Sequence, residues 1–181
     1  GNPKMADISL DTYLQLKGFS LDPEHSINNE GYATRTQLAQ MKQRLDSYAN
    51  IKRVVEIGLN GGHSADNFFK SCKSLEMFVS LDLNAHPYTK FACEYLQAKY
   101  GNRFAFIPGD SHRTVFEIAS YESSKKFDLI YIDGDHSYMG CRSDIENCKL
   151  LAHSESILWI DDYDNKEVKK AIRHAERHKL I

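Results

Sequence analysis

Four aspartates in two short segments have the residue type and the spacing to hold a metal ion. Asp133 and Asp135 follow one run of apolar residues, and Asp161 and Asp162 follow another. Carboxylates that gather at one place raise one another's pKa unless a cation neutralises them. A hard cation that prefers oxygen ligands, Mg²⁺ or Ca²⁺, is the natural partner. The alternative, helix capping together with hydrogen bonds from loop amides, accounts less well for four such residues.

A glycine-rich segment follows the apolar run that contains Glu56. Gly58, Gly61 and Gly62 lie within five positions, and a helical pattern begins near Ser64. Glycines permit a tight turn and the close approach of a ligand. The free N–H groups at the start of a helix can bind a carboxylate or a phosphate. Taken alone, the segment is also typical of an ordinary tight turn.

Two further polar segments follow apolar runs. Asp82 lies about one βαβ unit after Glu56, where a carboxylate can accept hydrogen bonds from both hydroxyls of a ribose. Asp110 and Ser111 could accept from and donate to the edge of an adenine ring. Each of these three polar residues could instead cap the helix that follows it, and one residue can do both.

These segments need a fold that brings them to one edge. Short apolar runs predict buried strands at residues 53–57, 77–81, 104–107, 129–132 and 157–160. Helical patterns separate or follow them at residues 64–72, 88–100, 113–121, 141–151 and 165–178. This alternation predicts an α/β fold, a Rossmann-like, doubly wound and mainly parallel sheet with helices on both faces. Ligands of such sheets bind beyond the carboxyl ends of the strands, which is where the polar segments lie.

The N-terminal part of the sequence differs from this alternating part. We expect residues 1–50 to form a helical cap with helices at 9–17 and 34–48, joined by a polar loop at 22–31. Residues 51–181 would form the ligand-binding domain. A length of 181 residues suits one compact domain overall.

Composition and charge narrow the range of partners. A net charge of −2 argues against a protein that binds nucleic acid through bulk charge, and no apolar run approaches the roughly 20 residues that span a bilayer. The basic residues of segment 165–178 could form a nucleic-acid face, but a solvated helix face explains them better. We therefore expect neither a nucleic acid nor a membrane as partner. The four cysteines form no C-x-x-C pair, which fits small core residues in a reducing cytoplasm.

In this order, the polar segments resemble those of class I S-adenosylmethionine-dependent methyltransferases. The resemblance covers residues 53–163 and is carried by E-I-G-x-x-x-G-x-S, L-D, G-D-S, F-D-L-I-Y-I-D-G-D-H-S-Y and I-D-D-Y. It is greatest to the cation-dependent O-methyltransferases of the catechol and caffeoyl-CoA type and to their bacterial relatives.

The resemblance implies a role for each segment. The predicted contacts of S-adenosylmethionine are Glu56, Gly58, Asn60, Gly62, Ser64, Asp82, Gly109, Asp110, Ser111 and Asp133. Glu56, Gly58, Gly62 and Ser64 would line its methionine part. Asp82 would hold the ribose, and Asp110 and Ser111 would contact the adenine.

The resemblance also implies a metal site and a catalytic base. Asp133, Asp161 and Asp162 fall where the family places its three metal ligands, for Mg²⁺ or Ca²⁺. His136 lies where relatives carry a lysine general base, and Asp133 and His136 are the predicted catalytic residues. A histidine could take that role because its pKa lies near neutrality, or it could serve as a cap or bond to Asp135.

The implied function is methyl transfer to a hydroxyl of a small molecule. Two alternatives stay open: a module that binds S-adenosylmethionine without transferring its methyl group, and, less favoured, an NAD-dependent oxidoreductase, because the loop reads G-x-x-x-G rather than G-x-G-x-x-G. The resemblance leaves a homodimer open. It also implies two more strands after the last helix, and we expect this C-terminal pair to be absent because the sequence ends at Ile181.

Overall fold

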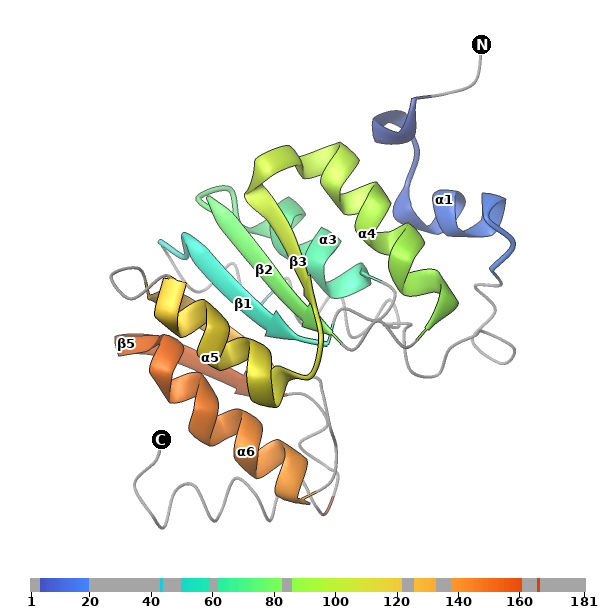
Figure 1. The fold of residues 1–181 in the computed structure, drawn as a ribbon. Helices are drawn as coiled ribbons and strands as arrows, with labels where there is room; N and C mark the ends of the chain where they lie inside the picture. Colours follow the sequence, from blue (N-terminus) through green and yellow to red (C-terminus); the bar gives the residue numbers. More distant parts are fainter. Residues whose placement is uncertain are drawn as a thin grey trace.

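In the part of the chain that the structure describes, five parallel strands form one central sheet (Figure 1). The computed structural model describes residues 4–19, 43, 50–58, 62–82, 86–121, 126–132, 138–160 and 166. The strands are β1 (Arg53–Ile57), β2 (Met77–Asp82), β3 (Phe104–Pro108), β4 (Phe127–Ile132) and β5 (Ala152–Ile160). Their order across the sheet is β3-β2-β1-β4-β5. The order therefore reverses between β1 and β4, which creates the switch point at which doubly wound sheets bind ligands.

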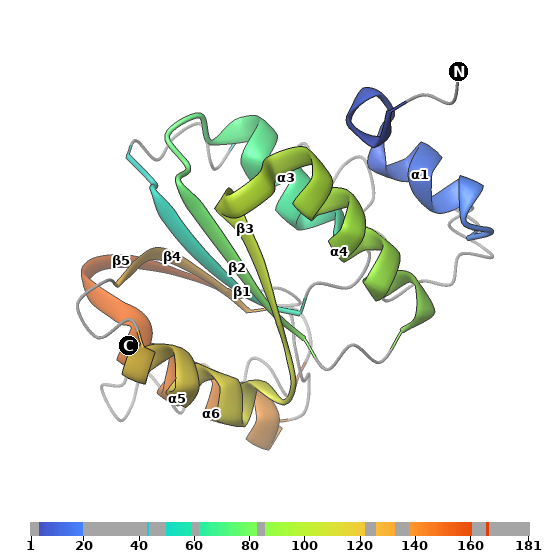
Figure 2. The same ribbon diagram turned by 45° about the horizontal axis from the view of Figure 1, so that its top comes forward.

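Helices cover both faces of the sheet, as Figure 2 shows. One face carries α3 (His63–Ser71) and α4 (Pro87–Tyr100), with α1 (Leu10–Leu16) packed outside α4; the other carries α5 (Ser111–Tyr121) and α6 (Tyr138–Cys148). Three short 3₁₀ helices are η1 (Met5–Asp7), η2 (Gly101–Arg103) and η3 (Lys149–Leu151). The predicted Rossmann-like, doubly wound fold is confirmed. The helices predicted at 34–48 and 165–178 lie outside the described residues, except for residues 43 and 166, which are helical. The loop predicted at 22–31 also lies outside them.

Strand β5 begins five residues before the predicted start at residue 157. The apolar pattern missed this first half of the strand because its residues are mostly polar and exposed. This half is tied to the beginning of β4: His153 Nε2 donates to Asp128 Oδ1 at 2.8 Å, and Ser156 Oγ donates to the Phe127 carbonyl at 2.6 Å. Asp128 also accepts hydrogen bonds from the backbone N–H groups of Lys52 and Arg53. Partial burial would raise the pKa of Asp128, but these hydrogen bonds outweigh it and lower the pKa.

Alternate residues of each strand pack against opposite helix layers, as the pleat requires. Phe68 of α3 is fully buried over the sheet, and its ring centroid lies 5.5 Å from that of Phe78, 5.9 Å from that of Tyr131 and 6.1 Å from that of Trp159. The opposite core joins aliphatic strand residues to α5 and α6 and includes Val55, Ile57, Val79, Leu81, Val115, Ile118, Ile145 and Cys148. One face of the sheet is thus rich in aromatic residues and the other is mainly aliphatic.

The N-terminal segment packs on α4. Ser9 begins α1, because its hydroxyl accepts a hydrogen bond from the backbone N–H of Thr12 at 3.1 Å. The hydroxyl of Tyr95 donates to the Ile8 carbonyl at 2.8 Å, and that of Tyr13 donates to Glu94 at 3.2 Å. The helix predicted at 9–17 is therefore present as α1. The division of the chain into an N-terminal cap (residues 1–50) and a ligand-binding domain (residues 51–181) stays a prediction.

Cys72, Cys93 and Cys148 are free thiols. Burial, with the nearby charge of Glu94, raises the pKa of Cys93 to about 11, and burial also raises the pKa of Cys148. Within the described ranges, no helix combines the length and apolar character needed to cross a bilayer.

Replacement of Phe68 by alanine should lower the free energy of unfolding by about 3–5 kcal/mol, because it leaves a cavity between three aromatic rings. Urea denaturation followed by circular dichroism measures this change. Leu16→Ala is the control: this side chain is 69% exposed, and its loss should change stability by less than about 0.5 kcal/mol. Equal effects of the two changes would contradict the assigned core.

Candidate functional site

The carboxyl ends of the strands meet at one edge of the sheet. Ile57 of β1 pairs with Leu81 of β2 and with Ile132 of β4, and Ile132 pairs with Ile160 of β5. The arrowheads of β1 and β2 accordingly lie side by side in Figure 1. The segments that sequence analysis selected therefore leave the sheet from neighbouring positions.

The turn after β1 requires glycine at both of its described ends. Gly58 has φ +101°, and its N–H donates to the Leu81 carbonyl at 2.6 Å. Gly62, at the start of α3, has φ +81°. A Cβ atom at Gly62 would lie 3.1 Å from Leu96 Cδ1 and 3.2 Å from Ala92 Cβ, so α4 leaves no room for it. Backbone conformation and space thus select glycine here, independently of any ligand.

A buried carboxylate lies between the strand and the helix that this turn joins. Glu56 is fully buried, and Ser64 Oγ in the first turn of α3 donates to Glu56 Oε1 at 3.1 Å. The positive end of the α3 dipole favours a negative charge at this place. Two predicted cofactor contacts are therefore brought together.

Sequence analysis missed a polar neighbour of Glu56. Ser80 of β2 is the cross-strand partner of Glu56 and is fully buried, and its hydroxyl has no hydrogen-bond partner among the described residues. A buried hydroxyl of this kind costs about 1–3 kcal/mol unless a water or a ligand satisfies it. The signal was available, since Ser80 is the one polar residue among the apolar residues 77–81.

The N-terminal segment contacts the same turn, which no sequence pattern indicated. His63 Nε2 lies 2.6 Å from Asp11 Oδ1 of α1. Leu10 Cδ2 lies 3.7 Å from the position that a Cβ atom of Gly62 would occupy. Helix α1 therefore packs against the beginning of α3.

The segment after β3 is held next to the end of β2. The Gly109 N–H donates to the Asp82 carbonyl at 2.8 Å, so these two predicted contacts are adjacent. The Asp110 carbonyl accepts hydrogen bonds from the Thr114 N–H at 3.0 Å and from its hydroxyl at 3.2 Å. The backbone of Asp110 thus begins α5, while its side chain lies at the exposed edge.

The hydroxyl of Ser111 has a partner inside the protein. Ser111 Oγ donates to Asp144 Oδ1 of α6 at 2.7 Å, and Asp144 is fully buried. The predicted donation from Ser111 to an adenine edge competes with this bond. Sequence analysis also missed Asp144, whose only local signal is an acid one residue before the buried Ile145.

Several predicted site residues lie outside the described residues: Asn60, Asp133, Asp135, His136, Asp161 and Asp162. Among the residues that are described, no group of three or more His, Cys, Asp or Glu side chains could hold a metal ion. The metal site and the catalytic base therefore stay predictions.

A family model described as a methyltransferase domain matches residues 55–163, more than half of the chain. The chain belongs to this methyltransferase family. The matched segment contains all five strand ends at the site, and the resemblance carried by the sequence motifs is confirmed. No curated protein matches the sequence of this methyltransferase.

Solved structures share its fold. The O-methyltransferase of Bacillus cereus in complex with SAH has a TM-score of 0.69 at 19% identity, over 98% of this chain and 80% of that chain. The SAH-bound methyltransferase of Podospora anserina has a TM-score of 0.66 at 18% identity, and the match covers 100% of this chain and 81% of that chain. A TDP-rhamnose 3'-O-methyltransferase of calicheamicin biosynthesis has a TM-score of 0.61 at 16% identity, and the match covers 98% of this chain and 86% of that chain. At such identities the similarity establishes a shared fold.

Gly62→Ala should destabilise the methyltransferase by about 2–5 kcal/mol, because it adds the clash with α4 to the cost of a positive φ. Gly18→Ala is the matched control. Gly18 also has a positive φ, +92°, but no atom of the described residues lies within 4 Å of the added methyl group. Thermal and urea unfolding of both variants measures the difference. If Gly18→Ala costs as much as Gly62→Ala, the close approach of α4 does not constrain the turn.

Proposed function

We propose that this methyltransferase uses S-adenosylmethionine to methylate a hydroxyl of a small molecule, with a divalent cation at the site. One observation carries the proposal: the family match covers the sheet edge at which Glu56, the glycine turn and Asp82 come together. Two of the similar structures, those from Bacillus cereus and Podospora anserina, are bound to SAH, and the first is an O-methyltransferase.

The described residues suit the chemistry of that cofactor. Glu56 is a buried acceptor beside the start of α3, where free N–H groups would attract the carboxylate of the methionine part while Glu56 attracts its ammonium. Asp82 is the last residue of β2, the strand next to β1, and would accept hydrogen bonds from the ribose hydroxyls. The hydroxyl of Ser80 would gain a partner through a bound group or an ordered water.

The chain would act mainly by orientation and by excluding water. The cofactor supplies an electrophilic methyl group on a positively charged sulfur. A buried carboxylate attracts a cationic ligand more strongly than the same carboxylate does in water. Holding donor and acceptor in line contributes much of the rate acceleration of a transfer between two bound molecules.

The metal and substrate parts of the proposal depend on Asp133, Asp161 and Asp162. Three carboxylates are a donor set that Mg²⁺ or Ca²⁺ prefers, and a divalent cation would supply the charge that lowers the pKa of a substrate hydroxyl. Ile132 and Ile160, which precede two of these aspartates, are register partners, and this pairing supports a shared site. His136 would accept the hydroxyl proton.

Asp82→Ala should weaken the binding of S-adenosylhomocysteine by about 10- to 100-fold, since a carboxylate that accepts hydroxyl hydrogen bonds contributes about 1.5–3 kcal/mol. Isothermal titration calorimetry measures the dissociation constants. Asp7→Ala, which removes an exposed carboxylate from η1, should leave them unchanged. Lack of binding to the unaltered protein at millimolar ligand would refute the proposed cofactor.

Asp162→Ala should abolish methyl transfer that depends on Mg²⁺ while changing the affinity for S-adenosylhomocysteine only a few-fold. Transfer is measured as labelled product from S-adenosylmethionine and a panel of small catechols and other hydroxylated molecules, with Mg²⁺ or with EDTA. Asp7→Ala is again the control. Equal turnover in EDTA would exclude the metal role. Cofactor binding without product from any acceptor would favour a binding module.

A further inference from the structure

A buried carboxylate lies behind the segment that would contact the adenine. Asp144 of α6 is fully buried, although no catalytic or cofactor role was predicted for it. Its Oδ1 accepts the hydroxyl hydrogen of Ser111 at 2.7 Å, across the gap between α6 and the first residue of α5. Helices α5 and α6 pack against each other on the same face of the sheet (Figure 2). The bond to Ser111 therefore links Asp144 to the proposed adenine site.

This bond fixes which hydrogen-bonding role Ser111 can offer to a ligand. A serine hydroxyl has one hydrogen to donate and two lone pairs that accept. The bond to Asp144 uses the hydrogen. What remains for a ligand at the carboxyl edge of the sheet is the accepting capacity of Ser111 Oγ.

The turn that precedes Ser111 is closely packed. Gly109 has φ +132°, and a Cβ atom there would lie 3.0 Å from Thr114 Cγ2. The Thr114 N–H and hydroxyl both donate to the Asp110 carbonyl. Asp144 lies beside the N-terminus of α5, where the helix dipole attracts negative charge, and its Oδ1 accepts from Ser111.

We propose that Asp144 is a positioning residue that turns Ser111 into a hydrogen-bond acceptor and thereby selects a purine with an amino group at C6 over one with an oxo group. The inference rests on the proposed function. An amino group at C6 donates hydrogens that Ser111 Oγ can accept. An oxo group would set two acceptors against each other, and a site that leaves such groups unpaired rejects the analogue.

The test compares two ligands that differ at this one position. S-adenosylhomocysteine carries the 6-amino group, and S-inosylhomocysteine carries a 6-oxo group. The unaltered protein should bind the amino form at least about tenfold more tightly by calorimetry. In Asp144→Ala, which removes the acceptor and so frees the serine hydrogen for the ligand, this ratio should fall toward one. Ser111→Ala should also lower the ratio toward one, whereas Ser111→Thr, which keeps a hydroxyl, should preserve it.

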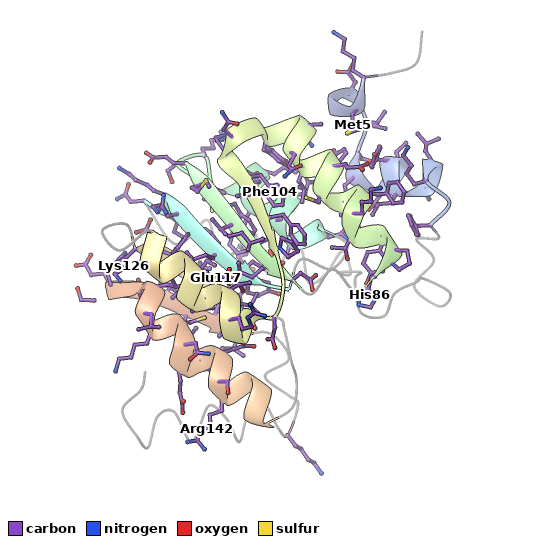
Figure 3. The ribbon with its side chains drawn as sticks, viewed as in Figure 1. Met5, His86, Phe104, Glu117, Lys126 and Arg142 are labelled. Atoms are coloured by element: carbon purple, nitrogen blue, oxygen red, sulfur yellow. The ribbon has the colours of Figure 1, made fainter. Side chains whose placement is uncertain are left out.

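The matched control is Glu146→Gln on the same helix. Glu146 is partly exposed and pairs with Arg142, whose side chain points away from the sheet in Figure 3. Its loss should leave the ratio unchanged. A merely structural role of Asp144 would weaken both ligands equally and would also leave the ratio unchanged, so the ratio separates the two roles.

The outcomes distinguish this inference from the proposed function. Absence of S-adenosylhomocysteine binding to the unaltered protein would overturn the proposed function, and the inference with it. If the unaltered protein binds both ligands tightly and their dissociation constants are nearly equal, only the inference is overturned. This measurement requires no variant. A ratio that persists in Asp144→Ala would also overturn it. If Asp144→Ala does not fold, a ratio that persists in Ser111→Ala does so instead.

Discussion

The in-register parallel pairing of β1 with β2 and with β4 is the constraint on which the site depends. Because side chains alternate along a strand, this register directs Glu56, Ser80 and Tyr131 to the face that α3 covers. A slip of one residue would exchange the two faces of a strand. Glu56 would then lie among the aliphatic residues under α5 and α6, away from Ser64. The large apolar cores on both faces fix the register and so position the few polar groups between them.

The two faces use the same arrangement at helix starts. On one face, buried Glu56 accepts from Ser64 in the first turn of α3; on the other, buried Asp144 accepts from Ser111 at the start of α5. A hydrogen bond to a charged group contributes about 1.5–3 kcal/mol and the helix dipole about 0.3–1, against a desolvation cost of several kcal/mol per ion. In each pair the serine hydroxyl and the helix dipole offset part of that cost. Each pair also fixes the orientation of a serine hydroxyl near the carboxyl ends of the strands.

The parts that the sequence predicted well are those with a local signal. Strands β1, β2 and β3 were predicted to within one residue because they are short apolar runs between polar ones. The beginning of β5 was missed, since its exposed residues carry no apolar pattern. The pairing of Glu56 with Ser64 follows from one continuous motif. The contact between Ser111 and Asp144 spans 33 positions and that between Asp11 and His63 spans 52, and no periodicity reports such tertiary contacts.

The geometry of the glycine turn also depends on residues before the segment that defines the family. Helix α1 has seven residues, too few to be stable alone in water, so its order comes from its contacts with the rest of the chain. Those contacts include the bond from Tyr95 to the Ile8 carbonyl and the pair of Asp11 with His63 next to Gly62. Leu10 Cδ2 also lies 3.7 Å from the position that a Cβ atom of Gly62 would occupy, so α1 and α4 both pack against the start of α3. The described part of the N-terminal segment therefore contributes to the packing around this turn.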